Sequence, residues 1–205
     1  MNNLIGILGG MGPGATVDAM QKLIKNTPAY KDQDHIPTIA VSIPDIPDRT
    51  QCILHKGASP LDKMIQYMQI LENAGAECII IPCNTAHSWF HELKKRSRVE
   101  MISIIDTTCQ AIQQQALSKV GLLATSATVQ TRIYQDTLNT LGIHCQVPDQ
   151  QAQQQVMESI YAYKSGEVDA AYQQLAPVRD KLLAAGVEKI ILGCTKQPKH
   201  TLSLI

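Results

Sequence analysis

The stretch LENAGAECIIIPCN, residues 71–84, aligns without a gap on the stretch LLAAGVEKIILGCT, residues 182–195. Each copy reads as a helix end, a glycine turn, a glutamate, a short apolar strand and then a cysteine. A weaker match pairs residues 4–8 with residues 119–123. An internal repeat of this kind reflects the architecture of the whole chain. The chain therefore reads as two similar halves.

Short runs rich in Ile, Leu and Val alternate along the chain with longer amphipathic stretches. This pattern predicts buried parallel strands with crossover helices, so the predicted fold class is α/β. We expect two halves, residues 1–105 and 106–205, each a parallel sheet flanked by helices and related by a pseudo-two-fold axis. The predicted strands cover residues 4–8, 38–43, 78–82, 101–105, 120–124, 144–147 and 189–193. The predicted helices cover residues 14–26, 60–74, 86–97, 107–117, 128–141, 151–164 and 168–184.

The 205 residues carry 18 Lys and Arg against 18 Asp and Glu, so the formal net charge is zero. This balance argues against a nucleic-acid partner. The apolar runs are far shorter than the roughly 20 residues that a membrane span needs, so we expect no membrane segment. The N-terminus has neither a basic region nor a long apolar run and does not read as a secretory signal, so we expect a cytoplasmic protein.

Six cysteines stand at irregular spacing with no C-x-x-C pair, which argues against a zinc ribbon and against a disulfide scaffold. Cys83 and Cys194 follow predicted strands at equivalent points of the repeat. Ligands of an open parallel sheet bind just beyond the carboxyl ends of its strands, so both thiols are placed for chemistry. Free cysteines usually pack as small hydrophobic residues. We read the other four in that way: Cys52, Cys78, Cys109 and Cys145.

Two thiols on opposite faces of a small substrate suit racemisation or epimerisation of a carbon acid. One cysteine would remove a proton as thiolate, and the other would deliver a proton as thiol. Their roles would exchange with the handedness of the substrate. If the two halves face each other about a pseudo-two-fold axis, Cys83 and Cys194 enter one cleft from opposite sides and could act as these two groups.

The opening GILGGMGPGA, residues 6–15, follows a strand and enters a helix. Glycines let backbone amides approach a ligand, and a helix N-terminus favours negative charge, so this loop predicts an anion site. Gly10, Gly12 and Ala15 also fit the spacing of a dinucleotide fingerprint, which keeps a nucleotide-dependent enzyme open as an alternative. Pro13 removes one amide donor, and the second predicted strand does not end in an acidic residue. We therefore favour a carboxylate as the ligand.

Two cations are candidates to bind that carboxylate. Arg49, in a predicted loop after the second strand, has a planar guanidinium that can bind a carboxylate with two hydrogen bonds. Lys164 ends a predicted helix. A lysine in the last helical turn also stabilises the helix dipole, so its position has a structural explanation that needs no binding role. Having both cations available favours a substrate with two carboxylates.

His87 follows Cys83 by four residues and His200 follows Cys194 by six, so a metal site or a thiol–imidazole nucleophile is conceivable. No compact ligand pair accompanies these residues, and nothing marks an oxyanion hole. The sequence therefore predicts no metal.

Taken together, these motifs resemble those of the aspartate/glutamate racemase family, the amino-acid racemases that work without pyridoxal phosphate. The resemblance runs from residues 6–13 through IPDRT at 46–50 and PCNTAH at 82–87. It continues through residues 120–125, Lys-Ser-Gly at 164–166 and LGCT at 192–195. It implies a duplicated α/β fold, a homodimer, an acidic amino acid as substrate, and neither metal nor cofactor. It assigns catalysis to Cys83 and Cys194, and it implies substrate binding by Met11, Arg49, Thr50, Gln51, Asn84, Thr85, Thr125, Lys164 and Thr195.

Two departures from the family pattern bear on activity. Lys196 stands where the family carries Glu, which places a positive charge beside the second thiol and favours its thiolate. The chain stops at Ile205, whereas similar proteins continue with a further strand and helix. We expect racemisation of aspartate, with glutamate or a broader set of amino acids second, and a related site could also act on maleate or a hydantoin. The alternative is a catalytically impaired homologue that binds a carboxylate or amino acid without turnover.

Overall fold

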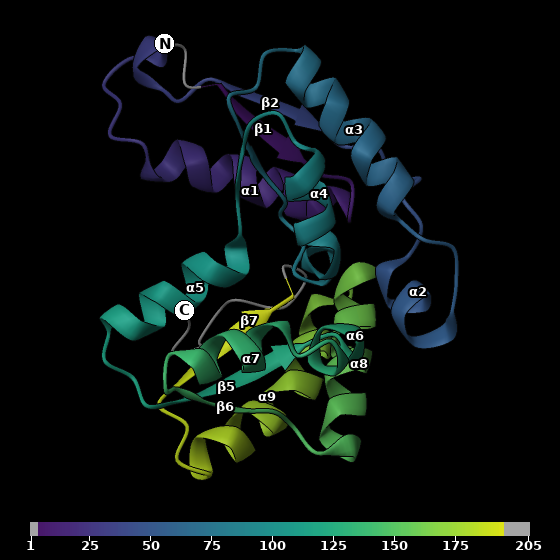
Figure 1. Ribbon diagram of the computed structural model, residues 1–205. Helices are drawn as coiled ribbons and strands as arrows, with labels where there is room; N and C mark the ends of the chain where they lie inside the picture. Colours follow the sequence, from purple (N-terminus) through teal and green to yellow (C-terminus); the bar gives the residue numbers. More distant parts are fainter. Residues whose placement is uncertain (1–3, 195–205) are drawn as a thin grey trace. The chain divides into compact units, whose positions relative to one another are not determined.

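The computed structural model describes residues 4–194 and divides the chain into two compact units, Met1–Ile104 and Ile105–Ile205 (Figure 1). The strands of the first unit are β1 (Ile5–Leu8), β2 (Thr38–Val41), β3 (Cys78–Ile80) and β4 (Glu100–Ile102). Its helices are α1 (Pro13–Asn26), α2 (Arg49–His55), α3 (Leu61–Asn73) and α4 (Phe90–Arg96), with 3-10 turns η1 (Asp32–Asp34) and η2 (Thr85–Trp89).

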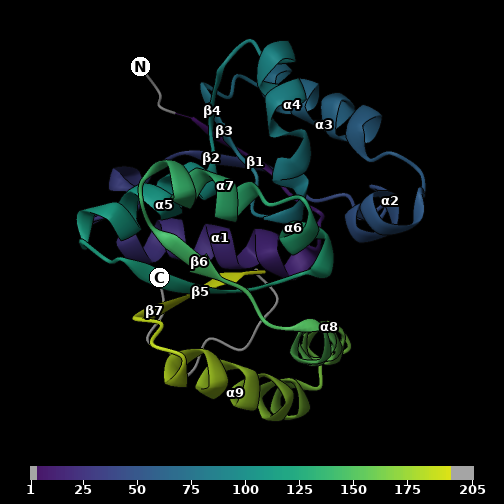
Figure 2. The ribbon, with the colours of Figure 1, turned by 60° about the horizontal axis from the view of Figure 1, so that its bottom comes forward.

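The four strands of the first unit form one parallel sheet in the order β2-β1-β3-β4. Ile5 is in register with both Thr38 and Cys78, so β1, β2 and β3 end at the same edge of the sheet. The sheet lies between α1 on one face and α3 on the other (Figures 1 and 2). The loops that follow these three strands therefore start from one edge.

Helix α3 packs a row of buried side chains into the core that supports this edge. Met64, Met68 and Leu71 recur at helical spacing and are fully buried in one cluster with Leu8 and Ile79 of the sheet. Each such side chain contributes roughly 1.5–3 kcal/mol by leaving water. The packing of these α3 side chains on β1 and β3 holds in place the sheet edge from which the loops start.

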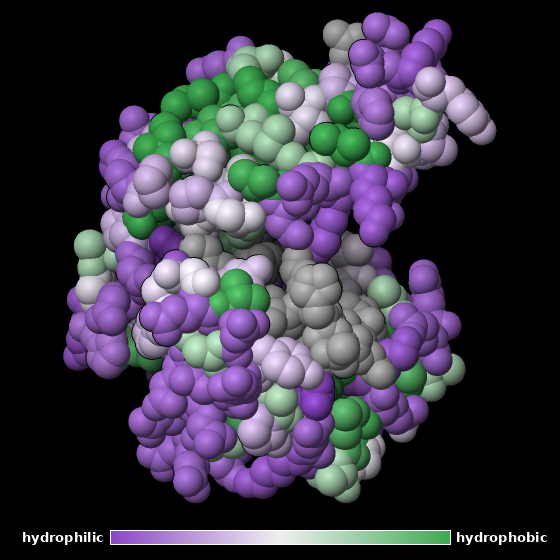
Figure 3. All heavy atoms as spheres, turned by 180° about the vertical axis from the view of Figure 1, so that it is seen from behind, coloured by the Kyte–Doolittle hydropathy of each residue, from purple (hydrophilic) through white to green (hydrophobic). Residues whose placement is uncertain are grey.

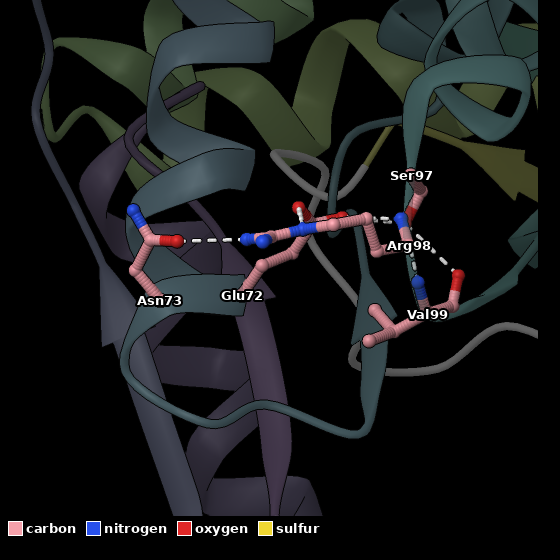
Figure 4. Close-up of polar contacts among 5 residues, drawn as sticks. All are labelled: Glu72, Asn73, Ser97, Arg98 and Val99. Atoms are coloured by element: carbon pink, nitrogen blue, oxygen red, sulfur yellow. Dashed lines mark hydrogen bonds and ion pairs between the residues drawn. The ribbon is translucent and has the colours of Figure 1, made fainter.

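The end of α3 is tied to the start of β4 by a buried carboxylate (Figure 4). Glu72 accepts hydrogen bonds from Ser97 Oγ at 2.9 Å, from the Arg98 amide at 2.7 Å and from Arg98 Nε at 2.9 Å. Arg98 Nη2 also donates to Asn73 Oδ1 at 2.7 Å. Burial raises the pKa of Glu72, but the Arg98 and Ser97 hydrogen bonds and the Arg98 charge outweigh it and leave that pKa below its ordinary value.

The second unit contains a parallel sheet of three strands in the order β6-β5-β7. Its strands are β5 (Lys119–Ala124), β6 (His144–Gln146) and β7 (Lys189–Gly193). Helix α5 (Ile104–Gln114) begins at the boundary, and α6 (Ser126–Gln130), α7 (Ile133–Thr140), α8 (Gln150–Lys164) and α9 (Val168–Ala184) follow. In Figures 1 and 2, α8 and α9 cover the face of this sheet opposite α7. The core on the α8 and α9 side contains Val156, Ile160, Leu175 and Leu182.

The two copies of the repeat turn from helix to strand in the same way. Gly75 and Gly186 both have positive φ, +92° and +83°, a conformation that glycine adopts without strain. The next residue in each copy donates its amide back to the helix: Ala76 to the Leu71 carbonyl at 3.0 Å and Val187 to the Leu182 carbonyl at 3.3 Å. The repeat in the sequence is therefore a repeat in structure.

The predicted α/β class with two parallel sheets is confirmed, and an observed strand overlaps each predicted strand range. Four local predictions are wrong. The predicted helix 86–97 is the 3-10 turn η2 followed by the short helix α4. Residues 104–105 begin α5 and do not end a strand, and the stretch 49–55, predicted as a loop at its start, is helix α2. The predicted helix 128–141 is two helices, because Arg132 between them has a left-handed φ of 57°.

Figure 3 colours the surface by hydropathy, and most of the exposed large hydrophobic side chains of residues 4–194 belong to the first unit. They include Val17, Met20 and Ile24 on one side of α1, with Ile36 nearby across a small groove of about 180 Å³. Within residues 4–194, no helix combines the length and the apolar character needed to cross a bilayer.

Candidate functional site

The glycine-rich loop after β1 is closed by hydrogen bonds to its own unit. The Gly9 amide donates to the Val41 carbonyl at 2.8 Å, and the Gly10 amide donates to Thr16 Oγ1 at 3.0 Å. A Cβ at Gly9 would overlap the Thr16 side chain, so only glycine fits there. Fewer backbone amides of this loop are therefore available to bind the predicted anion, because those of Gly9 and Gly10 already donate within the unit.

Arg49 is the first residue of α2, which corrects the predicted loop position. Asp48 caps this helix by accepting the Gln51 amide at 2.8 Å, and Lys56 ends it in a left-handed conformation. The signal was present in the sequence, since Asp48 and Gln51 have the spacing of a capping box. The predicted binding residues Thr50 and Gln51 lie in the first turn of the same helix.

The Arg49 guanidinium reaches back to the glycine-rich loop. Its Nη1 donates to the carbonyls of Ile46 at 3.1 Å and Pro47 at 3.0 Å, and its Nη2 donates to the Met11 carbonyl at 3.4 Å. Arg49 Nε is buried and has no hydrogen-bond partner among residues 4–194. The structure therefore brings Met11 and Arg49 together and leaves the buried Nε donor of the guanidinium unused among residues 4–194.

Cys83 follows β3 and belongs to the buried cluster that also contains Met11 and Ile46. It is 7% exposed, and its amide donates to the Ile81 carbonyl at 2.8 Å. The predicted binding residues Asn84 and Thr85 follow it and are buried at the start of η2. Three strand ends of one sheet thus supply Met11, Arg49 and Cys83.

His87 has both ring nitrogens engaged with backbone groups. Nδ1 lies 2.9 Å from the Cys83 carbonyl oxygen, and Nε2 accepts the Ile104 amide at 3.2 Å. In this arrangement the ring is neither a free metal ligand nor a base for the Cys83 thiol. The sequence could not show the second bond, because Ile104 lies in another element.

In the second unit, Thr125 and Cys194 follow neighbouring strands. Ala124, the last residue of β5, is in register with Gly193, the last residue of β7, so the next residues lie side by side at the sheet edge. Thr125 caps α6 by accepting the Thr128 amide at 3.1 Å. Cys194 is half-buried and packs against the core cluster of this unit.

Two further residues at this edge are not in the predicted set. Gln153 of α8 donates through Nε2 to the Ala124 carbonyl at 3.0 Å and to Ser126 Oγ at 3.2 Å. Its Oε1 is buried without a partner among the described residues. The Ser126 amide contacts the sulfur of Met157, one turn further along α8, at 3.2 Å. No motif marks either residue in the sequence.

Lys164 is the last residue of α8, as predicted, and is exposed. Its Nζ lies 5.4 Å from the ring centroid of Tyr161. It stands eleven residues after Gln153, about 16 Å along the helix. Its role as a second carboxylate ligand therefore stays a prediction, as does the site between the units. Thr195, Lys196 and His200 lie outside the described residues.

Three of the remaining cysteines, Cys78, Cys109 and Cys145, are less suited to chemistry. Burial raises the pKa of Cys109 and of Cys145 to about 12 each, and it also raises the pKa of Cys78. Thiols of this kind are poor nucleophiles because little thiolate forms near neutral pH. The described residues contain no group of three or more His, Cys, Asp or Glu side chains that could hold a metal ion.

The chain is similar in sequence and in fold to known proteins. The family model for Asp/Glu/hydantoin racemases matches residues 8–204. The structure is similar to an aspartate racemase of Picrophilus torridus, with a TM-score of 0.87 and 34% identity, over 96% of this chain and 82% of that one. The broad specificity amino-acid racemase RacX of Bacillus subtilis is 32% identical over 94% of this chain and 85% of its own length.

A glutamate racemase of Desulforudis audaxviator is 32% identical over 69% of this chain, which spans only 54% of that protein. The family match covers nearly the whole chain, both units included, and agrees with the likeness in fold to the Picrophilus enzyme. The chain belongs to the Asp/Glu/hydantoin racemase family.

Proposed function

We propose that this protein racemises an acidic amino acid, with aspartate preferred over glutamate, without a cofactor. One observation carries the proposal: Cys83 and Cys194 follow equivalent strands, β3 and β7, of two units that repeat the same helix, glycine turn and strand. Packing alone does not require a thiol twice at the same strand end. The name of the Picrophilus relative supports aspartate, whereas that of the Bacillus relative supports a broader range.

The proposed step moves only protons. The thiolate of one cysteine takes the α-hydrogen as a proton, and the electron pair of the broken C–H bond stays on the substrate, delocalised into its carboxylate. The thiol of the other cysteine then protonates the α-carbon on the opposite face. The first cysteine ends as thiol and the second as thiolate, so the reverse reaction uses the same two groups.

The proposed binding residues divide by unit. In the first unit, Arg49 would bind a substrate carboxylate through its fork of donors, beside Met11 and the loop amides. Thr50, Gln51, Asn84 and Thr85 complete this set. In the second unit we assign the other carboxylate and the amino group to Thr125, Lys164 and Thr195. By family likeness we also propose that the protein is a homodimer and that it is cytoplasmic. Light scattering of the purified chain would test the dimer.

Proton NMR in deuterium oxide tests the function. L-Aspartate, and separately L-glutamate, is incubated with the purified chain and no added cofactor. We expect the α-hydrogen signal of L-aspartate to disappear as D-aspartate forms, and to disappear more slowly with L-glutamate. A folded protein that is stabilised by aspartate against heat, yet exchanges no α-hydrogen, would contradict racemisation and support the carboxylate-binding alternative.

A further inference from the structure

His87 connects the loop of Cys83 to the point where the first unit ends. Its ring lies between the Cys83 carbonyl, 2.9 Å from Nδ1, and the Ile104 amide, 3.2 Å from Nε2. Ile104 is both the first residue of α5 and the last residue of the first unit. The side chain is only 6% exposed.

The two partners fix the protonation of the ring. The Ile104 amide can only donate, so Nε2 must accept and carries no proton. The Cys83 carbonyl can only accept, so Nδ1 carries the proton and donates it. His87 is therefore the neutral tautomer protonated on Nδ1, and both of its nitrogens are used for structure.

The same ring is fixed from a third side. Phe90 stacks on it with ring centroids 5.1 Å apart and planes inclined by 7°. The first amides of a helix have no carbonyl partner within that helix, so His87 also satisfies an amide at the start of α5. The Cys83 backbone is thus fixed by its own bond to Ile81 and by the anchored imidazole.

We propose that His87 is a positioning residue for Cys83: the bond from Nδ1 holds the backbone that carries the thiol, and the bond at Nε2 keeps the ring in place. The inference rests on the proposed function for its catalytic consequence. It differs from the metal-ligand and general-base roles considered for His87, because neither of those leaves both nitrogens bonded to the backbone.

Two substitutions separate the two bonds. His87→Asn places an amide donor near the position of Nδ1 and so retains a bond to the Cys83 carbonyl. His87→Gln places its amide near the position of Nε2, facing the Ile104 amide, and loses the bond to Cys83. His91→Gln is the matched control, since His91 is an exposed histidine on the neighbouring helix α4.

The catalytic test uses proteins in which only one thiol can act. In a Cys194→Ala background, Cys83 alone exchanges the α-hydrogen of one enantiomer with deuterium oxide. There we expect His87→Gln to slow exchange by about tenfold or more, as misplacement of a reacting group does, and His87→Asn to slow it less. In a Cys83→Ala background, where Cys194 acts, neither change should matter. An equal loss in both backgrounds, or a larger loss with Asn than with Gln, would overturn the proposal.

Two measurements do not depend on turnover. Nitrogen NMR of the wild-type ring should show a proton on Nδ1 and none on Nε2, and the opposite tautomer would refute the assignment.

If the wild type exchanges no α-hydrogen, the proposed function fails. Peptide-resolved labelling with iodoacetamide then decides the role of His87: His87→Gln should change the labelling rate of Cys83 by about threefold or more, and His91→Gln should not. Equal rates in the three proteins would overturn the positioning role.

Discussion

Gly6 and Gly121 occupy the same position in the two units. A Cβ on Gly6 of β1 would meet Leu71, Ala76 and Ile79, and a Cβ on Gly121 of β5 would meet Leu182, Val187 and Ile190. These neighbours are equivalent members of the repeat, taken in the same order. Each glycine lets the repeated helix end pack directly on the central strand that precedes a proposed site loop.

The two glycines should nevertheless differ in tolerance. At Gly6 an added methyl group would lie 3.0 Å from the Ala76 Cβ and 3.3 Å from the Leu71 Cβ, atoms that move only with the backbone. At Gly121 the nearest atoms, at 3.2 Å, are outer side-chain carbons of Leu182 and Val187, which can rotate away. We expect Gly6→Ala to lower the free energy of unfolding in urea by about 1–3 kcal/mol and Gly121→Ala by less. The reverse order would show that the first unit adapts more easily.

Glu72 should make stability depend on pH. Its pKa is lower in the folded protein than its ordinary value of 4.5, so its carboxylate stabilises the fold above that pH and the contribution is lost as pH falls through the lowered pKa. Glu72→Gln should cost about 1–3 kcal/mol at pH 7, a loss limited by the exposure of Arg98. The difference between wild type and variant should narrow below about pH 4.5. Urea unfolding from pH 3 to 7 measures this, with the exposed Glu77→Gln as control.

The sheets could be predicted from the sequence because strands buried on both faces are continuous apolar runs, and β1, β3, β5 and β7 lie in such runs. Helix α2 was missed at Arg49 because seven residues are too few for an amphipathic period, although Asp48 and Gln51 carried the capping signal. Contacts between distant positions were out of reach. The bonds from Arg49 to Met11 and from His87 to Ile104 depend on how separate elements pack, which no local pattern records.

Removing either proposed base should abolish racemisation without unfolding the protein. Cys83→Ala and Cys194→Ala each delete one sulfur from a packed position, a loss of about 1 kcal/mol that a domain tolerates. Each variant should still exchange the α-hydrogen of one enantiomer, and the two variants should prefer opposite enantiomers. Chiral chromatography and proton NMR in deuterium oxide give the two readouts. Full racemisation by either variant would exclude the two-thiol mechanism, and Cys52→Ala serves as the control.

Arg49 should affect both substrate affinity and stability. Arg49→Lys retains the positive charge but not the planar fork, so it cannot bind a carboxylate with two parallel hydrogen bonds. It also loses at least two of the three contacts to the carbonyls of Ile46, Pro47 and Met11. We expect the apparent aspartate affinity to fall by about tenfold and the free energy of unfolding to fall by about 1 kcal/mol.

The two effects of Arg49→Lys can be separated. Aspartate titrated against the melting temperature measures affinity, and urea unfolding without aspartate measures stability. Arg96→Lys, at an exposed position on α4, should change neither. Reduced stability with unchanged affinity would mean that Arg49 has only a structural role, through its hydrogen bonds from the start of α2 to the Met11 carbonyl and its neighbours. Reduced affinity would support a direct contact between Arg49 and the substrate. The buried Nε, which has no partner within residues 4–194, would then donate a hydrogen bond to the substrate carboxylate.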